Sequence, residues 1–216
     1  MGKEEKNLNC TDCSVYNCYR QEGGFPQFCL TTKISQEEIE EANQLYRTDD
    51  FTSKIAVAAA EVEGFYYGKL TRVEEIVAFA KRIGAKKIGI ATCLGLISEA
   101  KTFNKILTAK GLESYGIICK VGSTDKTDIG ISDEAKIQSG CHESLCNPVL
   151  QAKLLNKEKT DLNVIVGLCV GHDSLFIKHS DAPITTLVTK DRVLGHNPAA
   201  ALYTSGFYYK RLLKEE

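Results

Sequence analysis

The sequence lacks the features that identify three large classes of protein. No apolar stretch approaches the roughly 20 residues that a membrane-spanning helix requires, and no apolar segment of the kind found in secretory signals follows the charged residues 1–6. Lys and Arg number 27 against 28 Asp and Glu, so the net charge of −1 does not suggest a nucleic-acid-binding surface. We therefore expect a cytoplasmic protein that binds neither a membrane nor nucleic acid.

Nucleotide-binding loops are missing as well. No Gly-x-Gly-x-x-Gly and no Walker A motif follows a predicted strand, which disfavours dinucleotide and P-loop chemistry. The chain is instead rich in cysteine, with nine among 216 residues. Thiols stay reduced in the cytoplasm, so such a surplus indicates metal binding or thiol chemistry rather than disulfides.

Four of the cysteines lie in the first 33 residues. Cys10, Cys13, Cys18 and Cys29 follow the spacing C-x2-C-x4-C-x10-C, and few apolar residues accompany them. A segment with so little core needs another source of folding energy, and four thiolates that bind a metal supply it. The spacing matches neither the paired knuckles of common zinc sites nor the ferredoxin patterns. We predict that residues 1–33 form a metal-binding arm, with zinc and an iron–sulfur cluster both open.

Residues 34–216 have the pattern of an α/β domain. A helical lead-in, residues 34–84, contains two capping-box sequences, Ser35-Gln36-Glu37-Glu38 and Thr71-Arg72-Val73-Glu74. Strands then alternate with helices, which indicates a parallel sheet covered on both faces. We predict a three-layer, Rossmann-like or flavodoxin-like fold with strand order 2-1-3-4. The predicted strands are residues 87–92, 114–121, 162–168 and 184–189, and the predicted helices are residues 96–110, 147–159, 172–178 and 198–214.

The remaining cysteines gather at the carboxyl edge of the predicted sheet. Cys93 follows the first strand and Cys169 the third, and the order 2-1-3-4 makes these strands neighbours where the strand order reverses. Open α/β sheets bind ligands at this point. Cys141 and Cys146 lie in the long loop that starts from the same edge. We predict a second thiolate site from these four residues, while Cys119, near the end of the second strand, either joins them or packs in the core.

Local sequence adds detail to this second site. The run Cys146-Asn147-Pro148 places an Asn at the cap and a Pro at the first position of a helix, so Cys146 lies where the helix dipole favours a thiolate. Three histidines, His142, His172 and His196, lie at strand ends or in the long loop and are candidates to lie beside the thiols. Nucleophilic catalysis without metal, with Cys146 or Cys169 as thiolate and His172 or His196 as base, is an alternative.

Four motifs together make the chain resemble a family of small prokaryotic proteins, the domain of unknown function 1847 family, whose members are commonly labelled metal-binding. The resemblance covers nearly the whole length and implies a bound metal, but it implies no particular reaction. The motifs are Asn9-Cys10-Thr11-Asp12-Cys13 with Cys18 and Cys29, Ile90-Ala91-Thr92-Cys93, Gly140-Cys141-His142 with Cys146-Asn147-Pro148, and Gly167-Leu168-Cys169-Val170-Gly171-His172-Asp173.

Two functional hypotheses follow. The first is a cytoplasmic iron–sulfur or zinc protein whose second thiolate site supports redox or sulfur-transfer chemistry with a small-molecule or redox partner. If only three thiolates bind a four-iron cluster, the fourth iron is open to substrate. The second hypothesis is a non-catalytic module with structural zinc that senses or delivers metal.

Overall fold

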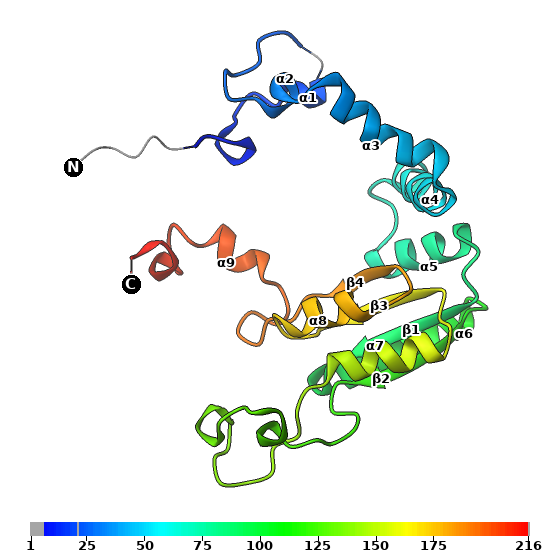
Figure 1. Cartoon of the computed structure of the whole chain (residues 1–216), viewed down its shortest axis with the longest axis vertical. Helices are drawn as coiled ribbons and strands as arrows, with labels where there is room; N and C mark the ends of the chain where they lie inside the picture. Colours follow the sequence, from blue (N-terminus) through cyan, green and yellow to red (C-terminus); the bar gives the residue numbers. More distant parts are fainter. Residues whose placement is uncertain (1–6, 21, 216) are drawn as a thin grey trace. The chain divides into compact units, whose positions relative to one another are not determined.

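The computed structural model of the chain describes residues 7–20 and 22–215 (Figure 1). These residues divide into two compact units, Met1–Ala59 and Ala60–Glu216. The cysteine-rich arm lies in the first unit and the sheet lies in the second. No helix in the described part of the chain is both long and apolar enough to cross a membrane.

The first unit is built from short helical pieces and one long helix. Three short pieces, η1 (Cys10–Asp12), α1 (Asn17–Arg20) and α2 (Leu30–Lys33), make up the arm. α3 (Gln36–Thr48) follows the predicted capping box, because the Ser35 hydroxyl accepts from the Glu38 amide and the Glu38 carboxylate accepts from the Ser35 amide. α4 (Asp50–Tyr66) continues into the second unit.

The second unit contains one parallel sheet in the predicted order, β2-β1-β3-β4. Its strands are β1 (Lys87–Thr92), β2 (Glu113–Ile118), β3 (Leu162–Val166) and β4 (Ile184–Val188). β3 is buried throughout and β1 nearly so, as expected of central strands covered on both faces. The α/β fold class and the neighbouring positions of the first and third strands are confirmed.

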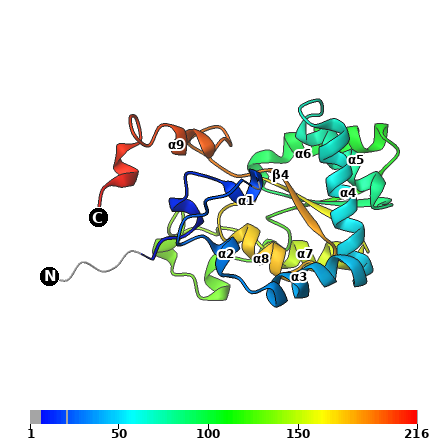
Figure 2. The same cartoon turned by 90° about the horizontal axis from the view of Figure 1, so that it is seen from above.

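Helices cover both faces of this sheet (Figure 2). α5 (Arg72–Arg82) and α6 (Ile97–Ala109) lie on one face, and α7 (Pro148–Lys157) and α8 (His172–His179) pack against each other on the opposite face. Leu155 from α7 and Phe176 from α8 are fully buried against Ile165 of β3. The result is the predicted three-layer arrangement.

The predicted helix over residues 198–214 is wrong. Only α9 (Ala199–Tyr203) forms there, followed by turns and the short η5 (Lys210–Leu213). The Thr204 hydroxyl donates to the carbonyl of Ala200, and the Ser205 hydroxyl donates to that of Leu202. Hydroxyl side chains that bond nearby carbonyls compete with helix propagation, and Gly206 adds a further helix-breaking residue.

Candidate thiol site

The backbone amides of Cys93 and Cys119 continue the hydrogen bonding of the sheet just beyond the ends of their strands. The Cys119 amide donates to the carbonyl of Thr92 at 2.8 Å, and the Cys93 amide donates to that of Val166 at 3.2 Å. Both side chains are buried, as is that of Cys169, which lies three residues after β3. The carboxyl ends of β1, β2 and β3 therefore each carry a buried thiol.

The start of α7 places a fourth thiol beside the end of β2. The Asn147 side chain caps the helix by accepting from the Leu150 amide at 2.9 Å, and Pro148 is the first helical residue. The Asn147 amide donates to the carbonyl of Cys119 at 2.8 Å, so the helix begins next to that cysteine. The predicted cap is confirmed, and it leaves Cys146 half-buried just before the helix.

Cys119 and Cys146 form a hydrogen-bonded thiol pair with opposite properties. The bond to Cys146, together with burial, raises the pKa of Cys119 well above its usual range. The same bond lowers the pKa of Cys146 to about 5, against the opposing effect of burial, and the cation of Lys120 and nearby His172 lower it further. The two shifts have opposite signs, so Cys146 is the more acidic thiol of the pair and Cys119 is the hydrogen-bond donor.

Cys93, which follows β1, and Cys169, which follows β3, form a second hydrogen-bonded pair. Burial raises the pKa of Cys169, and the neighbouring Cys93 adds to this rise. Arg192 opposes the rise and donates from its guanidinium to the Cys169 sulfur at 2.9 Å. The two pairs are not independent, because Cys119 also feels the charge of Cys93, and Cys169 that of Cys146.

A glycine allows the turns after β1 and β3 to meet. The turn η2 (Leu94–Leu96) directly follows Cys93 and packs its Leu96 side chain over Gly167, just beyond β3. A Cβ on Gly167 would lie 1.9 Å from the Leu96 Cδ1 atom, and the backbone there has φ +70. Glycine at this position satisfies both the close contact and the left-handed conformation.

Gln151 of α7 ties the helix to the strands beneath the thiols. Its side chain is fully buried, and its amide nitrogen donates to the carbonyls of Thr92 at 3.1 Å and Ile117 at 2.7 Å. Within the described residues, its Oε1 atom has no hydrogen-bond partner. A buried acceptor of this kind is costly to leave unpaired, and Gln151 lies one helical turn after the capping residue Asn147.

His196, a predicted neighbour of the thiols, instead organises the loop after β4. Its ring Nδ1 accepts from the Asp191 amide at 3.2 Å, and its own amide donates to the Asp191 carbonyl at 2.9 Å. The Asp191 carboxylate accepts from the amides of Val193 and Leu194. This closed loop also carries Arg192, which contacts Cys169.

The long loop between β2 and α7 is held together by Asp125. Its carboxylate accepts from the Thr127 and Glu143 amides, forms an ion pair with Lys136 at 2.9 Å, and lies 3.1 Å from the Nδ1 atom of His142. The Lys136 ammonium and the Thr127 donors hold the pKa of Asp125 well below its usual range. His142 is therefore part of the loop's own scaffold.

Cys141 lies on the exposed side of this loop, where its carbonyl accepts from Lys136 at 2.9 Å. The neighbours that shift the pKa of Cys119, Cys146 and Cys169 do not include Cys141. The structure thus brings Cys93, Cys146 and Cys169 together with Cys119, which the sequence left ambiguous. Of the predicted histidines, His172 is the one whose charge acts on a thiol of the group. We call Cys93, Cys119, Cys146 and Cys169 the thiol group.

The arm's cysteines have a different setting. Cys10 begins the single turn of η1 and Cys13 directly follows it, and Cys29 is the N-cap residue of α2 but makes no side-chain capping bond. Burial raises the pKa of Cys29, but hydrogen bonds from Thr31 and Thr32 outweigh it and lower the pKa. The buried Asn17 side chain holds this part of the chain by donating to the carbonyls of Gly23 and Gly24.

In the described residues, no disulfide joins any of the nine cysteines. In residues 7–20 and 22–215, no three His, Cys, Asp or Glu side chains have an arrangement ready to hold a metal ion. The predicted ligands in the arm and at the sheet edge therefore stay predictions.

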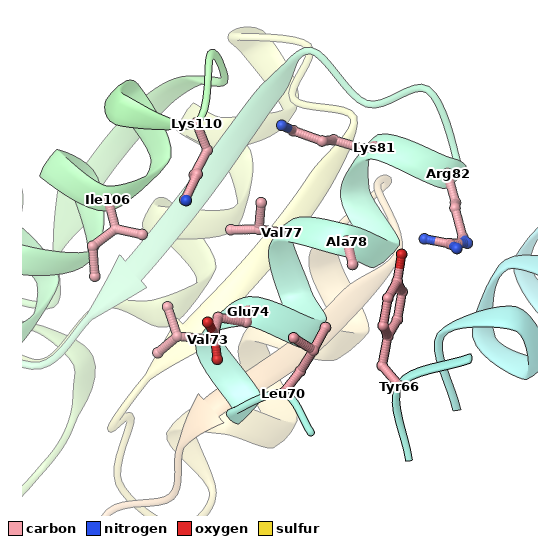
Figure 3. Close-up of a pocket in the computed structure, with 10 residues that line it drawn as sticks. All are labelled: Tyr66, Leu70, Val73, Glu74, Val77, Ala78, Lys81, Arg82, Ile106 and Lys110. Atoms are coloured by element: carbon pink, nitrogen blue, oxygen red, sulfur yellow. The ribbon is translucent and has the colours of Figure 1, made fainter. Parts of the chain in front are cut away.

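A separate pocket lies between α5 and α6 (Figure 3). It has a volume of about 360 Å³ and is lined partly by the apolar side chains of Val73, Val77 and Ile106. Figure 3 shows Ile106 and Lys110 at one end and Tyr66 with Arg82 at the other. The pocket contains no cysteine or histidine among its lining residues, so it offers none of the chemistry of the thiol group.

Comparison with known proteins places the chain in a family. Residues 29–187 match the family described as Protein of unknown function (DUF1847). The chain belongs to the DUF1847 family. It is 46% identical over 207 residues to an uncharacterized protein of Methanocaldococcus jannaschii, an alignment that covers 96% of this chain and 99% of that protein. No solved structure matches the chain.

The segment matched by the DUF1847 family coincides with one of the two cysteine groups. Residues 29–187 include the complete thiol group and the Asp125 loop, whereas Cys10, Cys13 and Cys18 lie before the matched segment. The resemblance to this family predicted from the sequence is confirmed.

Proposed function

We propose that this protein is a cytoplasmic metal-binding protein whose thiol group binds a soft metal, as an iron–sulfur cluster or as zinc. The observation that carries the proposal is the meeting of four thiols from the ends of three adjacent strands and the start of one helix. The proposal replaces Cys141, expected from the sequence, with Cys119.

The chemistry of the donors supports this assignment. Thiolates are the ligands preferred by zinc and by iron–sulfur clusters, and all four donors here are sulfur. Four thiolates carry more negative charge than one metal dication neutralises, and Arg192 and Lys120 lie against Cys169 and Cys146 to offset it. Burial of three of the thiols excludes water from the centre.

The protonation of the thiols sets the condition for binding. The pKa of Cys119 is raised and that of Cys146 is lowered, so the group consists of two hydrogen-bonded thiol pairs and not of a closed set of four thiolates. Metal binding requires that the remaining protons leave and that the two pairs draw together. Metal uptake at this group should therefore release protons and weaken as the pH falls.

Metal and acid-labile sulfide analysis of the full chain, purified anaerobically, tests the proposal. Broad visible absorption with iron and sulfide in matching amounts supports a cluster, and colourless protein with zinc supports a zinc site. Cys93→Ser, Cys119→Ser, Cys146→Ser and Cys169→Ser should each lower the metal bound outside the arm. Cys141→Ser is the matched control and should not. Equal metal content in all five variants would refute the assignment.

A second function is favoured by the unequal partners of the Cys119–Cys146 pair. Cys146 is half-buried and Cys119 is 2% exposed, the arrangement of an attacking thiol and a resolving thiol. Disulfide formation between them releases two electrons and two protons, which glutathione disulfide accepts as it becomes two glutathione thiols.

Equilibration of the metal-free chain in glutathione buffers, followed by peptide mapping, tests this second function. A Cys119–Cys146 disulfide that forms before any arm disulfide supports it. Mixed disulfides that remain on Cys146 without transfer to Cys119 would contradict it. Cys119→Ser is the informative variant, because it should trap the mixed disulfide on Cys146.

A further inference from the structure

We propose that the pocket between α5 and α6 binds a small monocarboxylate with an apolar body. This α5–α6 pocket lies within the second unit and has no cysteine in its lining, so the proposal goes beyond the thiol group and stands independently of it. Its volume of about 360 Å³ falls in the range of small-molecule sites. Apolar walls, an adjoining cavity and the charges at the two ends define the ligand.

Each helix beside the pocket presents apolar side chains followed by a lysine. On α5, Val73, Val77 and Lys81 are four residues apart, so they share one face of the helix. On α6, Ile106 and the C-cap residue Lys110 share a face in the same way. All five side chains line the pocket. An elongated ligand between the helices therefore meets apolar groups along its length and ammonium groups at one end.

A second cavity adjoins the α5–α6 pocket along α6. It also has a volume of about 360 Å³, and it shares Val73 and Ile106 with the first. Phe103 and Val188 are among its walls, and Glu99 is the charged side chain that lines it among the described residues. The two cavities together give a longer apolar path with a carboxylate at its far end. Because Glu99 would repel a second negative charge, the class is a monocarboxylate and not a dicarboxylate.

Three cations and one acid line the α5–α6 pocket, and two of the cations have acidic partners. The Arg82 guanidinium donates to the Glu61 carboxylate at 3.0 Å. Hydrogen bonds from the capping residue of α5 lower the pKa of Glu74, and the charge of Lys110 lowers it further. In the described part of the chain, no carboxylate lies within ion-pair distance of the Lys81 ammonium. One positive charge therefore remains unmatched, which fits a ligand with a single negative charge.

Figure 3 shows how these charges are distributed about the pocket. The ammonium groups of Lys81 and Lys110 lie in the upper part of the view, and the Glu74 carboxylate lies in the lower part. Glu75, the remaining acid of α5, lies 3.9 Å from Arg72 and does not line the pocket. The two lysines lie where α5 and α6 end, just before β1 and β2 begin. The positive end is thus at the amino edge of the sheet, whereas the thiol group is at the carboxyl edge.

A lysine near a helix C-terminus often only offsets the helix dipole, but neither helix here needs a lysine to close it. The Ala85 amide donates to the carbonyl of Ala80 at 2.9 Å, and the Leu112 amide donates to that of Leu107 at 3.0 Å. These backbone bonds satisfy carbonyls in the last turns of α5 and α6. The exposed ammonium of Lys81 is therefore available to a ligand.

Titration of the full chain with octanoate, followed by calorimetry, tests the proposal. Octanoate should bind more tightly than octanamide, which has the same apolar body without the charge. It should also bind more tightly than acetate, which has the charge without the body. Octanedioate should bind more weakly than octanoate because its second carboxylate approaches Glu99. Added salt should narrow the difference between octanoate and octanamide.

Variants of the lysines make the test specific. Lys81→Gln should lower the affinity for octanoate about fivefold, the effect of one charge about 4 Å away in water, and leave that for octanamide unchanged. Lys81→Arg keeps the charge and should retain the affinity. Lys105→Gln is the matched control, because Lys105 is an exposed lysine of α6 that lines neither cavity. Equal losses of octanoate affinity in Lys81→Gln and Lys105→Gln would overturn the inference.

A variant of the wall tests the apolar half of the proposal. Ala78→Leu adds volume to a side chain that lines the pocket and should weaken octanoate and octanamide alike. Circular dichroism shows that the variant is folded. If octanoate fails to bind and the chain is a dimer that Ile106→Glu dissociates, this face is an interface between two copies and the inference is overturned.

The result can be separated from that of the proposed function. Octanoate should bind equally to the chain as purified and after chelation, because the pocket lining contains no thiol. Binding that chelation abolishes would place the carboxylate on a metal and overturn the inference. Binding that persists in a chain without metal supports the carboxylate site while the metal assignment fails.

Discussion

The two groups of cysteines in this chain are positioned by different physical means. The thiol group stands on strand ends and a capped helix, so hydrogen bonds fix the backbone that carries its sulfurs before any ligand arrives. The arm relies on three short helical pieces and on the Asn17 side chain, and its cysteines are exposed or half-buried. The fold therefore positions the cysteines of the second unit in advance. The positions of the arm's cysteines depend instead on short helical turns and on side-chain hydrogen bonds.

The largest effect is expected where the sheet edge is most tightly built. Gly167→Ala places a Cβ 1.9 Å from Leu96 Cδ1 in a left-handed conformation, and we expect a loss of about 3 kcal/mol in the free energy of unfolding. Gly111→Ala is the matched control, because Gly111 also has a positive φ but nothing lies within 4 Å of its Cβ position. It should cost about 1 kcal/mol.

Urea titration monitored by circular dichroism compares the two glycine variants. If Gly167→Ala lowers the free energy of unfolding no more than Gly111→Ala does, the turn that carries Leu96 moves freely. The thiol group would then not be held more rigidly than the cysteines of the arm.

Replacement of cysteines in the arm should disorder the arm and leave the sheet folded. If metal supplies the arm's folding energy, the double variant Cys10→Ser, Cys13→Ser should lose amide protection over residues 7–33 while the second unit remains protected. Hydrogen exchange with mass spectrometry measures this. Unchanged protection of the arm would show that its polar contacts alone suffice.

Thiol reactivity should also differ between the groups in the metal-free chain. With a pKa of about 5, Cys146 is ionised throughout the neutral range, so its alkylation rate should rise as the pH passes about 5 and stay level above it. Cys169, whose pKa is raised by burial, should react only at alkaline pH. Alkylation at a series of pH values with peptide mapping tests this, and a shared alkaline midpoint would contradict the Cys119–Cys146 pairing.

The smallest effect is expected for Asn17, whose side chain holds part of the arm together. Asn17→Ala removes two hydrogen bonds to the carbonyls of Gly23 and Gly24 and should cost about 1 kcal/mol of local stability. Amide exchange should quicken near these glycines and nowhere in the second unit. Asn17→Asp tests the donor role, because a carboxylate cannot donate to the carbonyls and should be no better than alanine.

The sequence predicted the strands and the helix that carry the thiol group better than it predicted which cysteines belong to that group. Strand alternation located Cys93 and Cys169 at neighbouring strand ends, and the Asn147-Pro148 pair located Cys146 at a helix start. These predictions depend on local patterns, which can be recognised within a few consecutive residues. The order of the strands followed from general rules of crossover and needed no side-chain detail.

The exposed position of Cys141 depends on contacts that local patterns do not encode. Asp125 collects Lys136 and His142 in one cluster, and this turns the backbone at Cys141 outward. Likewise, the role of His196 depends on its pairing with Asp191 across a loop of positive φ. Both arrangements require side chains to find partners through a folded loop, so only the structure could identify them.

The Gln151 bridge bears on when the thiol group comes into being during folding. Its amide nitrogen reaches carbonyls at the ends of both β1 and β2, so α7 can dock in its native position only after these strands have paired. Parallel pairing joins residues far apart in the chain and forms late relative to local helices. A newly made chain therefore carries ordinary thiols, and the acidic thiol of Cys146 appears only on completion of the fold, which makes its reactivity a direct marker of the native state.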